Sequence, residues 1–227
     1  MEYIWINPVT AGMYESELLK KFLCKHGYRP LHTDINWMSI VKGKYASMVS
    51  QSRNTVIDMR CPKIKELLDE YHLDKQHKIT IPDIAPILIH CSQEIGSRED
   101  LKDKKKIITT PCQSLADMGN ALNLGNTRFI PWNRFLQELG DEPEGILPQK
   151  SPIPPGFFEE LSLRTVSISG EENIRKYFEQ FVPGEVQLIE LLYCQNGCHN
   201  GDGISRCSYN RTSTNIAVQR KSTNDEE

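Results

Sequence analysis

The chain has 227 residues, of which 38% are hydrophobic and 25% are charged, and its formal net charge is −3 at pH 7. This composition predicts a globular protein with one substantial core or two small ones, and the slight negative charge gives no sign of nucleic-acid binding. Since the sequence has neither a run of eighteen apolar residues nor the basic start and apolar run of a signal peptide, we expect a cytoplasmic protein without a membrane span.

Strands and helices are predicted to alternate from the N-terminus. Residues 3–7 favour a strand, residues 13–25 an amphipathic helix with Cys24 packed next to its apolar face, and residues 28–33 a second strand. Apolar residues with helical spacing indicate a less regular helix over 36–50. This alternation is the first sign of an α/β protein.

Cys61 lies between a predicted short strand and a predicted helix. Residues 54–58 favour a strand, and Cys61-Pro62 is typical of a helix start because proline is tolerated in the first turn. One apolar helix face follows, made of Ile64, Leu67, Leu68 and Tyr71. Residues 79–90 are apolar but contain two prolines, so we expect an extended or irregular segment. Cys91, which follows it, is expected in the core, with a spare metal ligand as the alternative.

The same pattern recurs around a second cysteine. Residues 106–110 favour a strand, Pro111-Cys112 a turn, and the helix after it has an apolar stripe of Leu115, Met118, Ala121 and Leu122. Cys61 and Cys112 are thus both expected just past the carboxyl end of a strand. Free N–H groups at the following helix start are expected to stabilise a thiolate there and to lower its pKa.

The rest of the chain continues the alternation and sets the fold class. The predicted elements are strands over 127–130, 166–168 and 186–192, helices over 132–139 and 171–181, and a proline-rich loop over 141–156. Together they predict an α/β fold of strand–helix units with a mainly parallel sheet. In such sheets ligands bind at the carboxyl ends of the strands.

The last predicted strand leads into a glycine-rich turn that carries two cysteines, Cys194 and Cys198. Glycines permit left-handed turns in which N–H groups crowd around anionic sulfur, so the turn indicates a metal cluster. The chain has seven cysteines and no export signal, which favours reduced thiols, some of them metal ligands, over a disulfide framework. Cys207 is expected to be an exposed thiol in a polar tail.

Three segments, taken in order, resemble the cluster-binding motifs in the catalytic C-terminal domain of the iron-only hydrogenase large subunit. They are Cys61-Pro62, Thr110-Pro111-Cys112 and Glu190-x-x-x-Cys194-x-x-Gly197-Cys198-x-x-Gly201-x-Gly203. The resemblance covers about residues 54–204 and implies a cluster-binding domain there. Residues 1–53 are left as an unmatched N-terminal α/β segment and residues 205–227 as a polar, disordered tail.

By this resemblance, Cys61, Cys112, Cys194 and Cys198 hold a 4Fe-4S cubane, and the residue matching Cys198 also bridges to the two-iron subcluster where hydrogen is made or split. The chain departs from the family at the positions that serve hydrogen chemistry. Arg60 stands where catalytic members place a proton-relaying cysteine, and arginine keeps its proton at working pH. Leu115 stands where a lysine donates to a cyanide ligand of the two-iron unit, and Thr110 and Met118 replace a methionine and a glutamate.

The sequence therefore favours an iron–sulfur protein that uses one cubane for electron transfer, redox sensing or support of a partner enzyme, without hydrogen turnover. Arg60 is expected beside the cluster, with a surface salt bridge as the alternative, and His199 either as a donor to the cluster or as a solvent-facing residue of the turn. A redox partner protein or partner enzyme is expected to dock through a basic patch. Two other functions stay open, a divergent hydrogenase and a structural zinc site of four thiolates.

Overall fold

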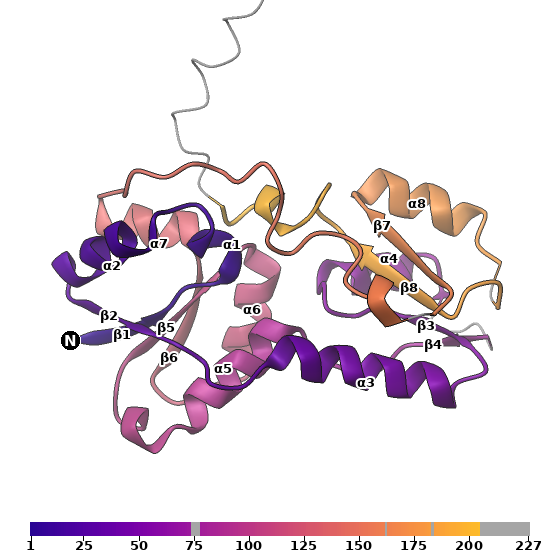
Figure 1. Cartoon of the computed structure of the whole chain (residues 1–227), viewed down its shortest axis with the longest axis horizontal. Coiled ribbons are helices and arrows are strands. Elements are labelled where there is room, and N and C mark those ends of the chain that lie inside the picture. The colour runs from indigo at the N-terminus through magenta and orange to yellow at the C-terminus, as the bar shows by residue number, and fades with distance from the viewer. Residues whose placement is uncertain (74–77, 162, 183, 205–227) are drawn as a thin grey trace, which may run out of the picture.

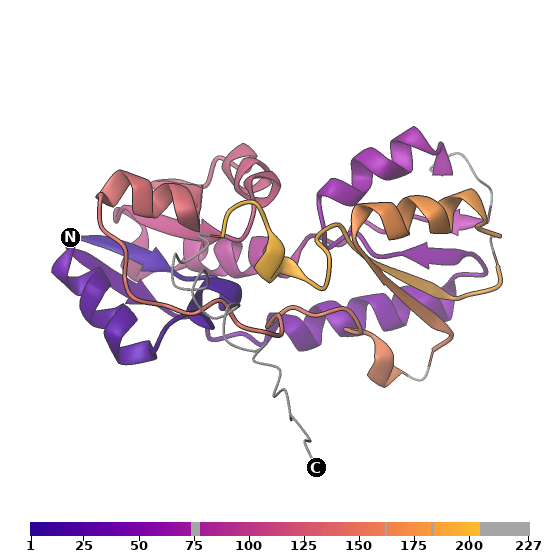
Figure 2. The same cartoon turned by 90° about the horizontal axis from the view of Figure 1, so that it is seen from above.

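The computed structural model describes residues 1–73, 78–161, 163–182 and 184–204. Over these ranges the chain is an α/β protein with two four-stranded sheets, and every strand pair is parallel. Each sheet with its helices forms a lobe, and the two lobes lie side by side (Figures 1 and 2). The predicted fold class is confirmed. The predicted tail at 205–227 and Cys207 lie outside the described residues.

The first lobe contains a sheet of strand order β2-β1-β5-β6 that is covered on both faces. Its strands are β1 (Glu2–Trp5), β2 (Tyr28–Leu31), β5 (Lys106–Thr110) and β6 (Thr127–Pro131). One face packs against α1 (Pro8–Ala11), α2 (Ser16–Lys25) and α7 (Trp132–Leu139), and the other against α5 (Ile87–Ser97) and α6 (Gln113–Ala121). Neighbouring residues of β5, Ile107 and Ile108, are buried in opposite clusters, as the alternation of a strand requires.

The second lobe contains a sheet of strand order β4-β3-β8-β7. Its strands are β3 (Thr55–Ile57), β4 (Ile79–Thr80), β7 (Thr165–Ser169) and β8 (Leu188–Leu192). Helices α4 (Lys63–Glu70) and α8 (Glu171–Glu179) cover one face, and α3 (Trp37–Gln51) covers the other. The central strand β8 is buried along its whole length, which accounts for its nearly continuous apolar sequence.

The chain passes between the lobes several times, so the lobes do not follow the predicted segments. Strands β1 and β2 come from residues 1–53 but share a sheet with β5 and β6, while α3 from the same segment packs on the second sheet. Residues 1–53 are therefore not a structural unit of their own. No helix in the described ranges is long and apolar enough to cross a membrane.

Several local expectations are wrong. The segment expected to be extended over 79–90 holds only the short strand β4 and then begins α5, with Pro86 as the N-cap residue. A proline just before a helix is compatible with it, and a short apolar run does not distinguish a strand from a buried helix. In α2, Cys24 is exposed, because the buried side of the helix is formed by Leu19 and Leu23.

The buried face of α6 also differs from the predicted stripe. Met118 and Leu122 are 37% and 38% exposed, whereas Gly119 is buried. The Phe129 ring of β6 lies so close that a Cβ on Gly119 would be 2.1 Å from Phe129 Cδ1. The missing side chain at Gly119 therefore makes room for the ring and sets the rotation of the helix.

We expect Gly119→Ala to lower the free energy of unfolding by about 1–3 kcal/mol, because the added methyl group must displace a buried ring. Gly43→Ala is the matched control, since Gly43 is an exposed residue of α3 with nothing within 4 Å of the added Cβ. That change should raise stability by about 0.5–1 kcal/mol through helix propensity. Urea unfolding of both variants makes the comparison, and a Gly119→Ala chain as stable as wild type would contradict the packing.

Candidate functional site

Cys61 and Cys194 follow adjacent strands of the second sheet. Strands β3 and β8 pair in parallel, with Ile57 opposite Ile189, so their carboxyl ends meet at one edge. The Cys61 thiol accepts hydrogen bonds from backbone N–H groups at the start of α4 and from Tyr193, the residue before Cys194. The turn after β3 is thereby tied directly to the turn after β8.

Cys112 lies on the opposite side, in the first lobe, at the N-cap position of α6. The third motif folds back onto this turn: the Gly203 N–H donates to the Pro111 carbonyl at 3.0 Å, and the Asn133 N–H donates to the Gly203 carbonyl at 2.9 Å. A Cβ on Gly201 would lie 2.3 Å from the Pro111 oxygen, and one on Gly203 would lie 2.9 Å from the Cys112 nitrogen. These two glycines let the second and third motifs pack backbone to backbone.

Gly197 has a different role, in the turn between Cys194 and Cys198. Its φ is +114°, and a Cβ there would lie 2.5 Å from the Ile153 carbonyl oxygen of the proline-rich loop. The expectation of left-handed glycines in the motif therefore holds for Gly197 alone, because Gly201 has φ −69° and Gly203 is not among the positive-φ residues. The proline-rich loop, residues 141–156, lies directly on the cysteine turn.

The four cysteines come together in space, and all four are partly buried. Burial raises the pKa of the Cys198 thiol well above its usual range, and the charges of Cys61, Cys194 and Cys112 raise it further. The pKa of Cys112 is raised to about 12, mainly by burial and in part by Cys61 and Cys194. The pKa of Cys194 is raised to about 11, again by burial first and then by Cys61. Cys61 thus acts electrostatically on the other three thiols.

The expected lowering of the thiol pKa at helix starts is wrong. At Cys61, the N–H groups of Tyr193, Lys63 and Ile64 do lower the pKa, but burial outweighs them and the net direction is upward. The Leu115 N–H likewise offsets only part of the effect of burial at Cys112. Four crowded, desolvated sulfurs can be anionic together only beside a compensating positive charge, which a metal centre supplies on displacing the thiol protons.

The spacing of the ligands bears on the kind of centre. In the described part of the chain, no group of three or more His, Cys, Asp or Glu side chains is placed to hold one metal ion. Four thiolates around a single zinc lie about 3.8 Å apart, as Zn–S bonds of about 2.3 Å in a tetrahedron require. A cubane binds each thiolate to a different iron, so its ligands converge without such close contact. The four thiols are a donor set that iron–sulfur clusters use.

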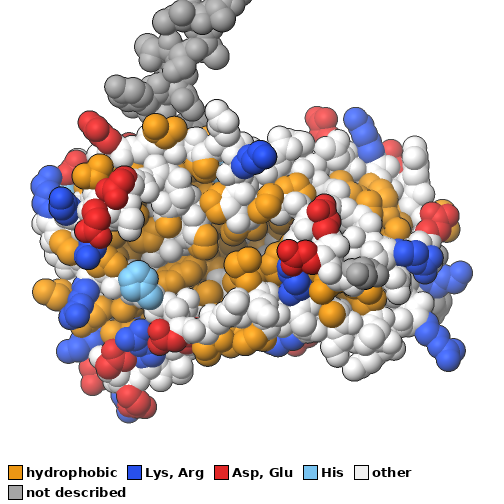
Figure 3. Space-filling model, viewed as in Figure 1, with side chains coloured by type: hydrophobic (Ala, Val, Ile, Leu, Met, Phe, Trp, Pro, Cys, Tyr) orange, Lys and Arg blue, Asp and Glu red, His pale blue; other side chains and the backbone are white. Residues whose placement is uncertain are grey.

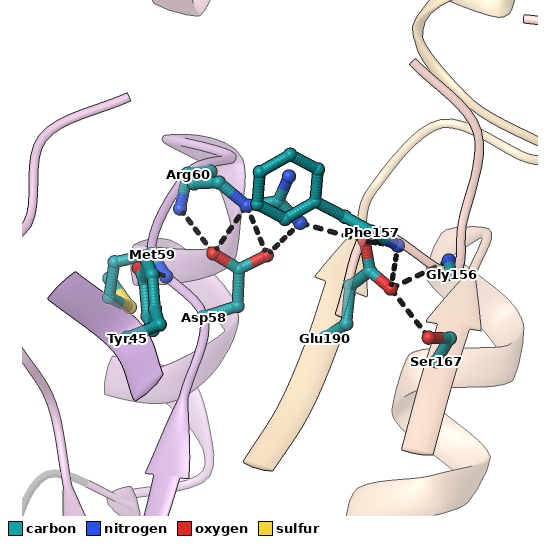
Figure 4. A network of polar contacts seen from close by, with 8 residues as sticks. All are labelled: Tyr45, Asp58, Met59, Arg60, Gly156, Phe157, Ser167 and Glu190. Atoms are coloured by element: carbon teal, nitrogen blue, oxygen red, sulfur yellow. Dashed lines mark hydrogen bonds and ion pairs between the residues drawn. The ribbon is translucent and has the colours of Figure 1, made fainter. Parts of the chain in front are cut away.

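Arg60, which precedes Cys61 in the sequence, forms a buried charge network with Asp58 and Glu190 (Figure 4). Its guanidinium donates to both carboxylate oxygens of Asp58, at 2.7–3.0 Å, and to Glu190 Oε1 at 2.7 Å. Asp58 and Glu190 are fully buried, and Arg60 is 8% exposed. The alternative of a surface salt bridge is therefore wrong. Arg60 also acts on Cys198, since its positive charge counteracts the rise of the thiol pKa.

Glu190, the first residue of the third motif, connects this network to the proline-rich segment. Its carboxylate accepts the N–H groups of Gly156 and Phe157 at 2.7–3.1 Å and the Ser167 hydroxyl at 2.5 Å. The Arg60 guanidinium carbon lies 3.9 Å from the centre of the Phe157 ring. The charge of Glu190 and the charge of Arg60 are thus each compensated by nearby partners. The same partners fix the end of the proline-rich loop.

His199 is buried and not solvent-facing, so that alternative is also wrong. Its Nδ1 atom has no hydrogen-bond partner among the described residues, and its Nε2 lies 3.4 Å from Asn200 Nδ2. Leu115 lies in the apolar core of the first lobe, and Thr110 donates its hydroxyl to the Cys112 carbonyl at 2.9 Å. Leu115 and Thr110, two of the positions that depart from the hydrogenase pattern, are therefore already packed or hydrogen-bonded within this chain, whereas Met118 is exposed.

The sequence analysis missed Asp202, which links the starts of α4 and α6. Its Oδ1 accepts the Gln113 N–H at the start of α6 at 2.9 Å, and its Oδ2 lies 3.1 Å from Lys63 Nζ of α4. The preference for an acidic group at a helix start could have suggested the first contact, but nothing local indicated which helix. Cys24 and Cys91 are separate from the site, exposed on α2 and buried in α5 respectively.

We expect Arg60→Met to destabilise the fold by about 3–5 kcal/mol, because it leaves two buried carboxylates without their cation. Denaturant unfolding of the variant and the wild type at pH 7 measures this loss.

The matched control is Arg128→Met, which breaks an ion pair with Glu138 whose two side chains are each 50% exposed. That change should cost about 0–1 kcal/mol. Equal losses from the two substitutions would contradict the buried network.

No protein-family model and no curated protein matches this sequence. The relation to iron-only hydrogenase domains therefore depends on the three cysteine motifs and stays a prediction.

Proposed function

We propose that the chain binds one 4Fe-4S cluster through Cys61, Cys112, Cys194 and Cys198. The observation that carries this proposal is the convergence of four thiols from three separate turns, in which Cys61 acts on the pKa of the other three. Such a cluster supplies one-electron redox chemistry when bound. The partial exposure of all four cysteines is compatible with a centre that exchanges electrons with a partner.

The residues around the thiols fit such a role. The N–H groups of Tyr193, Lys63 and Ile64 point their positive ends at the Cys61 sulfur, and hydrogen bonds to cluster sulfurs are a principal means of setting a reduction potential. The fixed cation of Arg60 acts on Cys198 and favours the more negative, reduced state. Together these groups raise the potential.

Electron transfer, redox sensing or support of a partner enzyme suits this chain better than hydrogen turnover. Arg60 is bound by Asp58 and Glu190 and does not release its proton, so it cannot replace a relaying thiol. Leu115 offers no hydrogen bond to an anionic diatomic ligand. We propose a cytoplasmic protein that receives electrons from a redox partner protein or partner enzyme, which docks through a basic patch.

Counting metals on protein purified without oxygen, from a host with hydrogenase maturation enzymes, tests the proposal. We expect about four irons per chain, because one cubane accounts for all four cysteines. About six irons would instead indicate a divergent hydrogenase with a two-iron subcluster on Cys198. About one zinc and no iron would indicate a structural four-thiolate site.

Single substitutions assign the ligands. Cys194→Ser should lose most of the iron and the visible absorption of the cluster, because serine replaces a thiolate ligand with a poor one for iron. Cys24→Ser and Cys91→Ser are matched controls, since Cys24 is exposed and Cys91 lies in the apolar core of the first lobe. Retention of four irons in the Cys194→Ser chain would contradict the assignment.

A further inference from the structure

The four cysteines are divided equally between the lobes. Cys61 and Cys194 follow β3 and β8 of the second sheet. Cys112 follows β5 of the first sheet, and Cys198 packs against the first-lobe core on the 3-10 helix Cys198–Asn200. Any centre that binds all four thiols would therefore join the two lobes with two bonds to each.

On the side of the molecule that carries the four cysteines, the ion pair between the lobes is weak. The bridging residue is Asp202, which contacts Lys63 of α4 in the second lobe and the Gln113 N–H of α6 in the first. The Lys63 and Asp202 side chains are 27% and 47% exposed. An exposed ion pair of this kind contributes about 0–1 kcal/mol.

The stronger apolar connection lies elsewhere, where α3 and α5 pack together. Ile87 of α5 packs against the cluster formed by Val41 and Tyr45 of α3, whereas Trp37 at the start of α3 packs against the first-lobe core. In Figure 1 these helices run along the bottom of the molecule, and the third cysteine motif lies at the top. The face between the lobes is hollowed and mainly hydrophobic, with most charges toward the two ends (Figure 3). The α3–α5 contact therefore lies on the side opposite the cysteines, where it can act as a hinge between the lobes.

The proline-rich loop spans the same junction and is anchored on both lobes. Near one end the Ile146 N–H donates to the Met13 carbonyl of the first lobe at 2.8 Å, and at the other the Gly156 N–H donates to Glu190 of the second at 2.7 Å. Between these anchors the loop lies against Gly197. A change in the separation of the lobes must therefore strain or release this loop.

We propose that occupancy of the four cysteines by a metal cluster sets the closure of the two lobes. With the cluster bound, the edge opposite the α3–α5 hinge is held shut. Without it, the Asp202 contacts are too weak to hold the lobes, and the proline-rich loop is released. This inference rests on the proposed function. Under it, a partner protein can distinguish the chain with the cluster from the chain without it by the closed or open arrangement of the lobes.

Hydrogen exchange on the full chain tests the inference, comparing the iron-loaded protein with the same protein after iron chelation without oxygen. The junction amides are those of Ile146 and Gly156, which anchor the proline-rich loop on the first and the second lobe. They should exchange about tenfold faster after chelation, because release of the loop exposes them. Amides of β1 and β5, inside one sheet, should not change. Equal exchange of the junction amides in both states would overturn the inference.

The Asp202→Ala variant distinguishes the contribution of the Asp202 side-chain contacts to lobe closure from that of the cluster. In the iron-loaded chain it should leave junction exchange unchanged, because the cluster still joins the lobes, and in the iron-free chain it should speed that exchange further. Asp100→Ala is the control, since Asp100 pairs with Arg98 within the first lobe. If Asp202→Ala changed junction exchange equally in the iron-loaded and the iron-free chain, the inference about lobe closure would be overturned, but the proposed function would not. A chain that binds no iron would overturn the proposed function and the inference together.

Discussion

Burial of negative charge is the constraint on which this structure depends. Asp58 and Glu190 are fully buried, and the four neighbouring thiols must become anionic to bind a metal. Water cannot compensate these charges, so the protein does so with groups that keep their charge or dipole: the Arg60 guanidinium and backbone N–H groups directed at Glu190 and Cys61. The geometry of the turns after β3 and β8 follows from this need.

The glycines of the third motif show how the same constraint shapes the backbone. Bringing Cys198 close to Cys112 requires the two turns to touch, and at Gly201 and Gly203 a side chain would overlap Pro111 or Cys112. Of the three glycines, only Gly197 has a positive φ, which favours glycine for its backbone conformation. Cysteine-bearing segments that are far apart in the sequence can therefore meet because two residues contribute no side chain and one permits a turn.

The sequence could predict the features that depend on local pattern. Strand, turn and helix around Cys61 and Cys112 were readable because each unit has its own apolar period, and parallel strands place their ends at one edge. Contacts between distant segments were not readable. The burial of Arg60 depends on Glu190, 130 residues away, and the burial of Gly119 in α6 depends on the Phe129 ring of the next strand. Helix α5 was missed because its apolar start follows a proline and resembles a buried strand.

Arginine in place of an ionisable thiol changes what the site can do with an electron. A group that gives and takes a proton couples reduction to proton transfer, as hydrogen chemistry needs. Arg60 is held by two carboxylates that raise its pKa further, so it stays a fixed cation through any change at the cysteines. A fixed cation stabilises added negative charge on Cys198 without moving a proton. If the proposed cluster is bound, the arginine that stands in place of a relay thiol therefore favours a centre that passes or senses single electrons.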